Sequence, residues 1–139
     1  IIAELYVPRP CFGAFMEDAR ETLRRRRANV IYGTVRLIER DDETFLPWAR
    51  DRFACVIFNL HTEHTPEGLE RSREAFRYLI GAASGREGSY FLTYHRWATK
   101  EQVLRCYPQF PEFLARKRAY DPGEVFQSDW YRHHRERLA

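Results

Sequence analysis

The chain contains little lysine and little cysteine, and it has no long hydrophobic run. Lys100 and Lys117 are the only lysines among 23 basic residues, and the formal net charge is a mildly basic +3. Such a charge is only a weak indication of nucleic-acid binding. A membrane helix needs about 20 consecutive apolar residues, and no stretch approaches that length, so we expect no transmembrane segment.

The start of the chain indicates a piece of a longer protein. It begins at Ile1 without a methionine, and the apolar stretch over residues 1–7 already has the pattern of a strand. This stretch is too short for a signal peptide and lacks a basic leader. We therefore expect the chain to be one part of a larger protein, with no secretory leader.

The cysteines and histidines give no metal or disulfide pattern. Cys11, Cys55 and Cys106 are odd in number and widely spaced, so neither a disulfide framework nor a CxxC metal site is expected. His61 and His64 form an HxxH without a suitably spaced third ligand, so we expect no metal site. The cysteine usage favours a reducing compartment. We expect a cytoplasmic protein, and peripheral contact with a membrane stays open.

Hydrophobic periodicity predicts four strands and two helices in the first part of the chain. The 139 residues, 44% of them hydrophobic, suit one domain with an appended segment. Alternating patterns predict strands, and patterns with helical spacing predict helices. In chain order the expected elements are a strand at 1–7, a helix at 11–27, strands at 30–39 and 53–61, a helix at 66–84 and a strand at 89–95. This βαββαβ order predicts an α+β, ferredoxin-like fold, with a four-stranded antiparallel sheet and both helices on one face.

The strand alternation places polar and aromatic side chains on the face that the helices leave uncovered. That face is expected to hold Glu4, Tyr6, Tyr32, Thr34, Arg36, Asn59 and His61, together with either Thr93 and His95 or Tyr90 and Tyr94. An antiparallel sheet can simply face water on one side. Tyr, Asn, His and Arg are also side chains that hydrogen-bond to or stack on a ligand, so the pattern favours a ligand or partner surface. The arginine run at 24–27 leaves two interpretations open, a solvated helix end and a phosphate site.

The last forty residues extend beyond a ferredoxin-like unit. We expect domain boundaries at 1–98 and 99–139, with short helices at 99–105 and 110–119, a turn at 120–123 and an aromatic-rich end. A small domain does not need such an arm for its own core. The arm is therefore predicted to dock on another part of the protein.

The arm carries the residues of a family resemblance. Lys117, Tyr120, Asp121, Pro122 and Phe126 match a pattern like FLxxKxxYDPxxxF. This stretch resembles the C-terminal end of FAD-linked oxidases of the vanillyl-alcohol oxidase type, and residues 127–130 extend it as in bacterial FAD/FMN-containing dehydrogenases. The substrate (cap) domain of that family is ferredoxin-like, which agrees with the strand order.

The resemblance implies a division of labour between two domains. An upstream FAD-binding domain, absent from this chain, would bind most of the FAD and be the arm's partner. The open sheet face would lie over the isoalloxazine and shape the pocket for a hydroxyl-bearing small molecule. On this interpretation the chain alone is inactive. The residues implied near the cofactor are Arg96, Lys117, Tyr120 and Phe126.

Within this family the layout looks closest to the sugar-alcohol and aldonolactone oxidases. The stretch 34–38 resembles their E-I-R-T-I motif, with Arg36 at the arginine and Thr34 in place of the acidic residue. His61 falls at a polar position on the adjacent strand. The stretch 95–100 resembles an HWGK motif, in which Arg96 or Lys100 would replace the lysine.

The implied chemistry is hydride transfer to flavin N5 from a C–H next to a hydroxyl, in a hydroxy acid, sugar alcohol or lactone. A cation beside the N1/C2=O edge would stabilise the reduced ring, and Arg36, Arg96 and Lys117 are candidates. His61 and His95 are the candidate bases for the hydroxyl proton. The residues expected to orient substrate are Tyr32, Thr34, Asn59 and Tyr94.

Two other functions fit the same fold. Aromatic side chains on the open face of a βαββαβ sheet are typical of an RNA-recognition module. The strand at 53–61 lacks the signature of that module, so no nucleic acid is expected as a partner. A small regulatory domain that binds a metabolite without flavin is the other alternative, and it predicts an independently stable homodimer.

Overall fold

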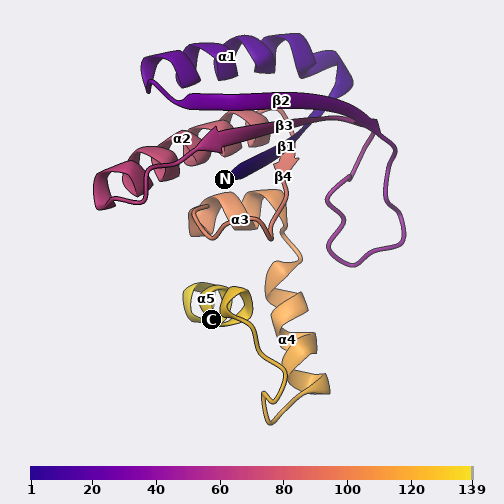
Figure 1. The fold of residues 1–139 in the computed structure, drawn as a ribbon. Helices are drawn as coiled ribbons and strands as arrows, with labels where there is room; N and C mark the ends of the chain where they lie inside the picture. Colours follow the sequence, from indigo (N-terminus) through magenta and orange to yellow (C-terminus); the bar gives the residue numbers. More distant parts are fainter. Residues whose placement is uncertain (139) are drawn as a thin grey trace.

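The computed structural model describes residues 1–138 and shows an α+β fold with a C-terminal helical arm (Figure 1). The elements are β1 (Ile2–Pro8), a 3₁₀ turn (Arg9–Cys11), α1 (Phe12–Arg25), β2 (Asn29–Ile38), β3 (Phe53–His61), α2 (Pro66–Ser84), β4 (Ser89–Tyr90), α3 (Lys100–Cys106), α4 (Phe110–Tyr120) and α5 (Asp129–Leu138). None of these helices is long and apolar enough to cross a membrane.

The strands form one antiparallel sheet in the order β2-β3-β1-β4. This is the ferredoxin-like order, because α1 carries the chain from β1 past β3 to β2, and α2 carries it from β3 past β1 to β4. The predicted fold class is confirmed. The β1–β3 register pairs Leu5 with Val56 and Tyr6 with Cys55, so each strand turns alternate side chains to the same two faces.

One face of the sheet packs against α1 and α2. Leu5 and Val56 lie in one continuous core with Phe15 of α1 and Leu79 of α2, and all four are almost fully buried. The start of α2 follows the sequence signal, because the hydroxyl of Thr65 accepts a hydrogen bond from the amide of Gly68. The helix face is therefore an ordinary apolar core.

The fourth strand is much shorter than the sequence predicts. Its ladder with β1 contains only Ser89 and Tyr90, so the strand predicted at 89–95 is wrong over residues 91–95. The hydroxyl of Tyr107 donates to the carbonyl of Tyr90, and Trp130 Nε1 donates to the carbonyl of Leu92 at 2.9 Å. Side chains of the arm thus donate hydrogen bonds to backbone carbonyls at the point where a longer strand would continue.

The arm completes the core rather than standing apart from it. Tyr107, Phe110 and Leu114 are at most 4% exposed and belong to the same core as the sheet. The expectation that the domain does not need the arm is therefore wrong. Because β4 is so short, the end of α2 and the ring of Tyr90 would be uncovered without α3 and α4. The start of α3 has a full capping box between Thr99 and Gln102, as the sequence indicates.

Candidate functional site

The candidate site lies on the face of the sheet opposite α1 and α2. The strand registers place three rows of side chains across this face, one on each of β2, β3 and β1. From one end to the other these rows are Tyr32, Asn59 and Ile2; then Thr34, Ile57 and Glu4; then Arg36, Cys55 and Tyr6. The sequence alternation therefore predicted correctly which residues of β1, β2 and β3 share this face, whereas Tyr90 of β4 pairs with Leu5 and lies on the helix side.

Glu4 is the centre of a hydrogen-bonded cluster on this face. Its Oε1 accepts a hydrogen bond from the hydroxyl of Tyr6 at 2.6 Å and another from the thiol of Cys55 at 3.4 Å. Burial is the main cause that raises the pKa of both donors, with Glu4 adding to the effect, and the Cys55 thiol reaches about 12. Both groups therefore keep their protons at neutral pH and hold the carboxylate in place.

Tyr94 and Arg36 lie at the exposed side of this cluster. The pKa of Tyr94 is raised by partial burial and then by the charge of Glu4 and a hydrogen bond to it, while Arg36 lowers it. Arg36 stands directly opposite Cys55 in the register, and within residues 1–138 it forms no ion pair. A cation without an ion-pair partner thus lies next to Cys55, one of the two residues that hold the half-buried carboxylate of Glu4.

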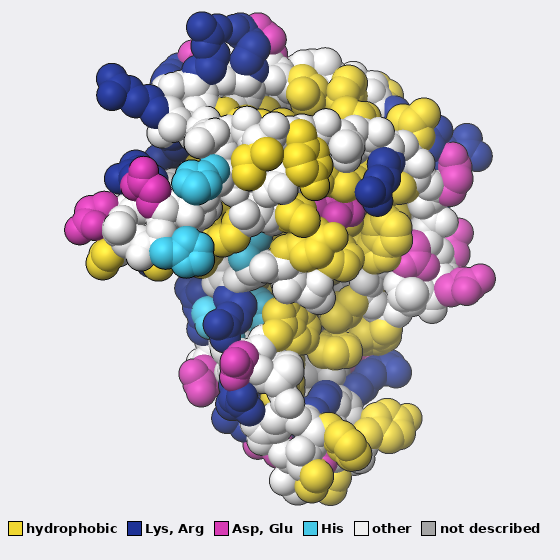
Figure 2. Space-filling view, viewed as in Figure 1, with side chains coloured by type: hydrophobic (Ala, Val, Ile, Leu, Met, Phe, Trp, Pro, Cys, Tyr) yellow, Lys and Arg dark blue, Asp and Glu magenta, His cyan; other side chains and the backbone are white. Residues whose placement is uncertain are grey.

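Only part of the face is open. The connection between β2 and β3 folds over β1, where the ring of Trp48 lies 5.4 Å from that of Tyr6 and Ala49 is buried. Ser89 holds this connection by donating from Oγ to the carbonyl of Trp48 at 2.9 Å. The expectation of a wholly open polar face is corrected: its β1 half forms a small second core, while its β2 half is bare. Figure 2 shows hydrophobic side chains gathered over the middle of the view, with charged ones mostly around them.

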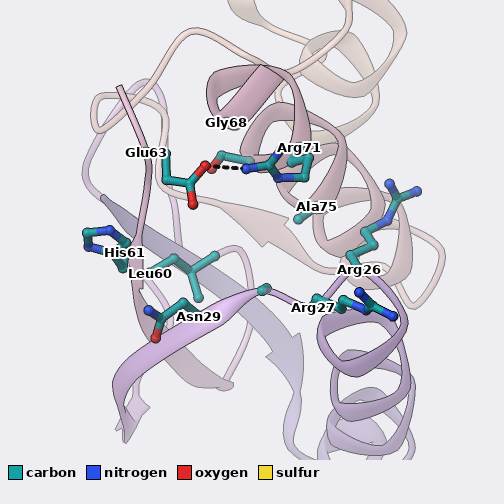
Figure 3. Close-up of a pocket in the computed structure, with 11 residues that line it drawn as sticks. Arg26, Arg27, Asn29, Leu60, His61, Glu63, Gly68, Arg71 and Ala75 are labelled. Carbon is teal, nitrogen blue, oxygen red and sulfur yellow. Dashed lines mark hydrogen bonds and ion pairs between the residues drawn. The ribbon is translucent and has the colours of Figure 1, made fainter. Parts of the chain in front are cut away.

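The predicted substrate residues Tyr32, Thr34 and Asn59 lie on this face, and Tyr94 lies beside it. His61 is on the same strand and face as Asn59 but is exposed, at the end of β3. It lines a small cavity of about 100 Å³ at the start of β2, together with Arg26 and Arg27 (Figure 3). In this view an ion pair between Glu63 and Arg71 spans the cavity.

His95 lies apart from this site. Its ring packs edge-on against Phe76 of α2 at 4.2 Å and beside Trp97 at 5.4 Å, so it belongs to the helix side of the sheet. Burial lowers the pKa of His95 to about 4, and the imidazole is neutral at pH 7. The structure does not bring His95 together with Arg36 and Glu4, and the predicted role as a base on the open face does not fit. The physical reason is the short β4, after which the chain turns toward the helices.

The residues expected near a cofactor divide into two groups. Lys117 forms an ion pair with Asp121 at 2.6 Å and lies 4.3 Å from the ring centre of Tyr131, so its charge is already neutralised. Arg96 donates to the carbonyl of Asp129 at 3.2 Å. Tyr120 and Phe126 are instead exposed, at 90% and 80%.

The loop that presents these aromatic side chains is built around Asp121. Its carboxylate accepts hydrogen bonds from the amides of Val125 and Phe126 as well as from Lys117. These contacts also lower the pKa of Asp121, with Lys117 as the main cause. In the matched KxxYDPxxxF stretch, Lys117 and Asp121 therefore shape the loop, and Tyr120 and Phe126 point outward.

Sequence reasoning placed Glu4 and Tyr6 on this face but did not choose them as site residues, and it treated Cys55 as a core residue. The available signal was a single carboxylate within an otherwise apolar alternating strand, which needs buried partners if it is to remain there. Comparison with known protein family models and with curated proteins found no match for the chain.

Proposed function

We propose that the chain is the substrate-binding cap and C-terminal arm of an FAD-dependent oxidoreductase. Its substrate would carry a hydroxyl group, as a hydroxy acid, sugar alcohol or lactone does. The observation that carries this proposal is the placement of Arg36, which has no ion-pair partner within residues 1–138, on the bare β2 half of the face and directly opposite Cys55 of the Glu4 cluster. A cation and a hydrogen-bonded carboxylate on strands that are separated by one other strand suit a small polyfunctional ligand.

Each group has a role set by its chemistry. Arg36 binds a carboxylate or lactone oxygen of the substrate, or offsets negative charge on the ring edge of a reduced cofactor. Glu4 accepts a hydrogen bond from the substrate hydroxyl, with Tyr94 at its rim to orient the ligand. Glu4 is therefore also the group placed to take the hydroxyl proton, because His61 lies four residues farther along β3, roughly 13 Å away, and is out of reach of the same small substrate. When bound, the flavin accepts the hydride.

The residues of the chain fit a cofactor in part. The exposed rings of Tyr120 and Phe126 and the free charge of Arg36 are available to a second domain and its flavin. Lys117 does not fit a cofactor role, because Asp121 already neutralises it. The exposed side chains of Tyr120, Val125 and Phe126 support the proposed docking of the arm on an FAD-binding domain.

The test is the visible absorption spectrum of the product of the complete gene that encodes this chain. The expected result is a pair of flavin bands near ~370 and ~450 nm that bleach when one of a panel of hydroxy acids, sugar alcohols or lactones is added anaerobically. A colourless product that also fails to bind added FAD contradicts the proposal. Binding of a metabolite to such a colourless product would favour a regulatory ligand-binding domain instead.

A further inference from the structure

The outer edge of β2 is long, apolar and bare. Every residue of the strand except Ile38 is exposed, including Ile31 at 58%, Val35 at 50% and Leu37 at 69%. β2 is at the end of the strand order, so its outer backbone groups have no strand partner within residues 1–138. Monomeric proteins protect such edges with charges, proline or bulges. Here the strand has one charge, Arg36, no proline, and a bulge only near its start.

The exposed side chains form two distinct stripes. Val35 and Leu37 pair with Val56 and Ala54 of β3, so they lie on the helix side of the sheet. Their exposure shows that α1 does not cover this edge. Tyr32, Thr34 and Arg36 form the stripe on the other face. An edge strand with exposed apolar side chains on the helix side is suited to pair with a strand of another chain, so that the sheet extends across both chains.

We propose that two copies of the chain pair through β2, antiparallel and around a two-fold axis at Thr34, so that the two sheets become one. Side chains opposite each other in such a pair must share a face, which restricts the register. With Thr34 opposite Thr34 of the second copy, Leu37 faces Ile31, Val35 faces Gly33, and Arg36 faces the ring of Tyr32. Apolar residues then meet apolar ones, and the single cation of the strand lies on an aromatic face.

The charges at the two ends of β2 select this orientation and this partner. The segment before the strand is basic, with four arginines at 24–27, and the segment after it is acidic, with Glu39, Asp41, Asp42 and Glu43. Antiparallel pairing of two copies places each basic end beside the acidic end of the other copy. Within residues 1–138, Arg24, Arg27 and Glu43 form no ion pair of their own. A parallel arrangement would bring like charges together.

The pairing is closed, because the same strand serves both copies and leaves no further β2 edge. It therefore yields a dimer and not a fibre. The inference does not rest on the proposed function, since it is argued from the outer edge and the ends of β2 and needs no flavin, although Arg36 and Tyr32 of that strand also belong to the proposed site. A colourless gene product would leave it intact.

The experiment is sedimentation equilibrium of the 139-residue chain over a range of concentrations at low salt. The expected species is a dimer, and Leu37→Lys converts it to a monomer by placing two charges in the apolar stripe. Leu37 is largely exposed, so the circular dichroism and the thermal transition of the variant should match those of the unchanged chain. Ile31→Lys is a second variant with the same expected result. The matched control is Val125→Lys, at another exposed apolar side chain, which should remain dimeric.

A charge exchange tests the orientation. Arg27→Glu and Glu43→Arg should each weaken the dimer, raising its Kd by roughly tenfold, because each creates a like-charge contact at both ends of the interface. The double variant Arg27→Glu/Glu43→Arg should restore the original Kd. A monomer at all concentrations, a larger open-ended assembly, a dimer that survives both lysine variants, or a double variant as weak as the single ones would each overturn the proposal.

Discussion

The two faces of the sheet differ in the kind of side chain that the same strands place on them. On the helix side, Val56 and Phe58 of β3 lie in a continuous apolar core that reaches from α1 to the arm. On the other side, Cys55 of the same strand holds a carboxylate, and Arg36 of the neighbouring strand has no partner. The helix side stabilises the fold. On the open side, hydrogen bonds from Tyr6 and Cys55 offset the free-energy cost of removing the Glu4 carboxylate partly from water.

This contrast indicates which face of the sheet can carry a function. A sheet covered on both faces would have no place for an unpaired cation on the same face as a hydrogen-bonded carboxylate. Here α1, α2 and the buried side chains of the arm share one core on the helix side, so changes to that face should act on folding. Changes to the open face should act on binding, with smaller effects on folding.

The largest effect is expected on the helix side, from Phe110→Ala in α4. Phe110 is fully buried and its ring lies 5.5 Å from that of Trp130 and 5.0 Å from that of His134. Removing a buried phenylalanine side chain typically costs about 3–5 kcal/mol. Urea denaturation monitored by circular dichroism should show this loss as a single transition with a lower midpoint, because the arm and the sheet share one core.

The control for this variant is Phe126→Ala in the same arm. Phe126 is 80% exposed, so the free energy of unfolding should change by less than about 0.5 kcal/mol. If Phe110→Ala instead unfolds the arm while the sheet keeps its original transition, the continuity of the core is refuted.

The helix side should also make the protein sensitive to acid. Burial lowers the pKa of His134 to about 4, and His134 is only 3% exposed. Below the ordinary histidine pKa near 6.5 the unfolded chain takes up a proton that the folded chain refuses, so stability is full above pH 6.5 and falls toward pH 4. The loss for His134 is up to roughly 3 kcal/mol at pH 4.

This dependence is measured by urea midpoints from pH 7 to pH 4.5, a window above the pH at which most carboxylates titrate. His134→Leu should flatten the slope, while His64→Gln, on the exposed loop before α2, should leave it unchanged. Burial also lowers the pKa of His95 to about 4, so His95 accounts for the slope that remains in His134→Leu. Equal slopes in all three proteins would show that the buried imidazole of His134 does not control acid stability.

A smaller loss of stability is expected from Glu4→Ala on the open face. The variant leaves the buried hydroxyl of Tyr6 without its acceptor, which costs about 1–3 kcal/mol. Glu4→Gln keeps an acceptor oxygen at the same place and should recover most of the stability while removing the negative charge. Thermal and urea unfolding of the two variants separate the packing role of the side chain from its charge.

If Glu4 serves only the fold, the gene product with Glu4→Gln should retain full turnover. We expect turnover to fall while stability is kept. The contrast between Ala and Gln at this one position therefore tests whether the open face is a binding site.

Most of the fold followed from local signals in the sequence. The starts of α2 and α3 are determined by the nearby side chains of Thr65 and Thr99, and the helices predicted at 66–84 and 99–105 begin within one residue of the observed positions. The alternation in β1, β2 and β3 also assigned the two faces. The end of β4 was not predicted, because it depends on Tyr107 and Trp130, which approach from the arm through tertiary contacts.

The site was less predictable than the fold for the same reason. The sequence pattern indicated that Arg36 shares a face with Tyr32, but pattern alone cannot show that Trp48 covers Tyr6 or that Asp121 captures Lys117. Helix α5, which places His134 in the core, has a strongly polar composition and was expected only as an aromatic-rich end. Its stability comes from packing, not from helix propensity.

The smallest effect on stability, and the sharpest separation of the two faces, is expected for Arg36→Gln. Arg36 is exposed on an edge strand and forms no ion pair within residues 1–138, so the free energy of unfolding should change by less than about 0.5 kcal/mol. A cation that contributes nothing to folding yet lies next to Cys55 of the Glu4 cluster is expected to act on a ligand, and kcat/KM of the complete gene product should fall at least tenfold. Arg40→Gln, just beyond the same strand, is the matched control and should leave kcat/KM unchanged. Unaltered kinetics in Arg36→Gln would remove this residue from the site and leave the open face without its only free charge.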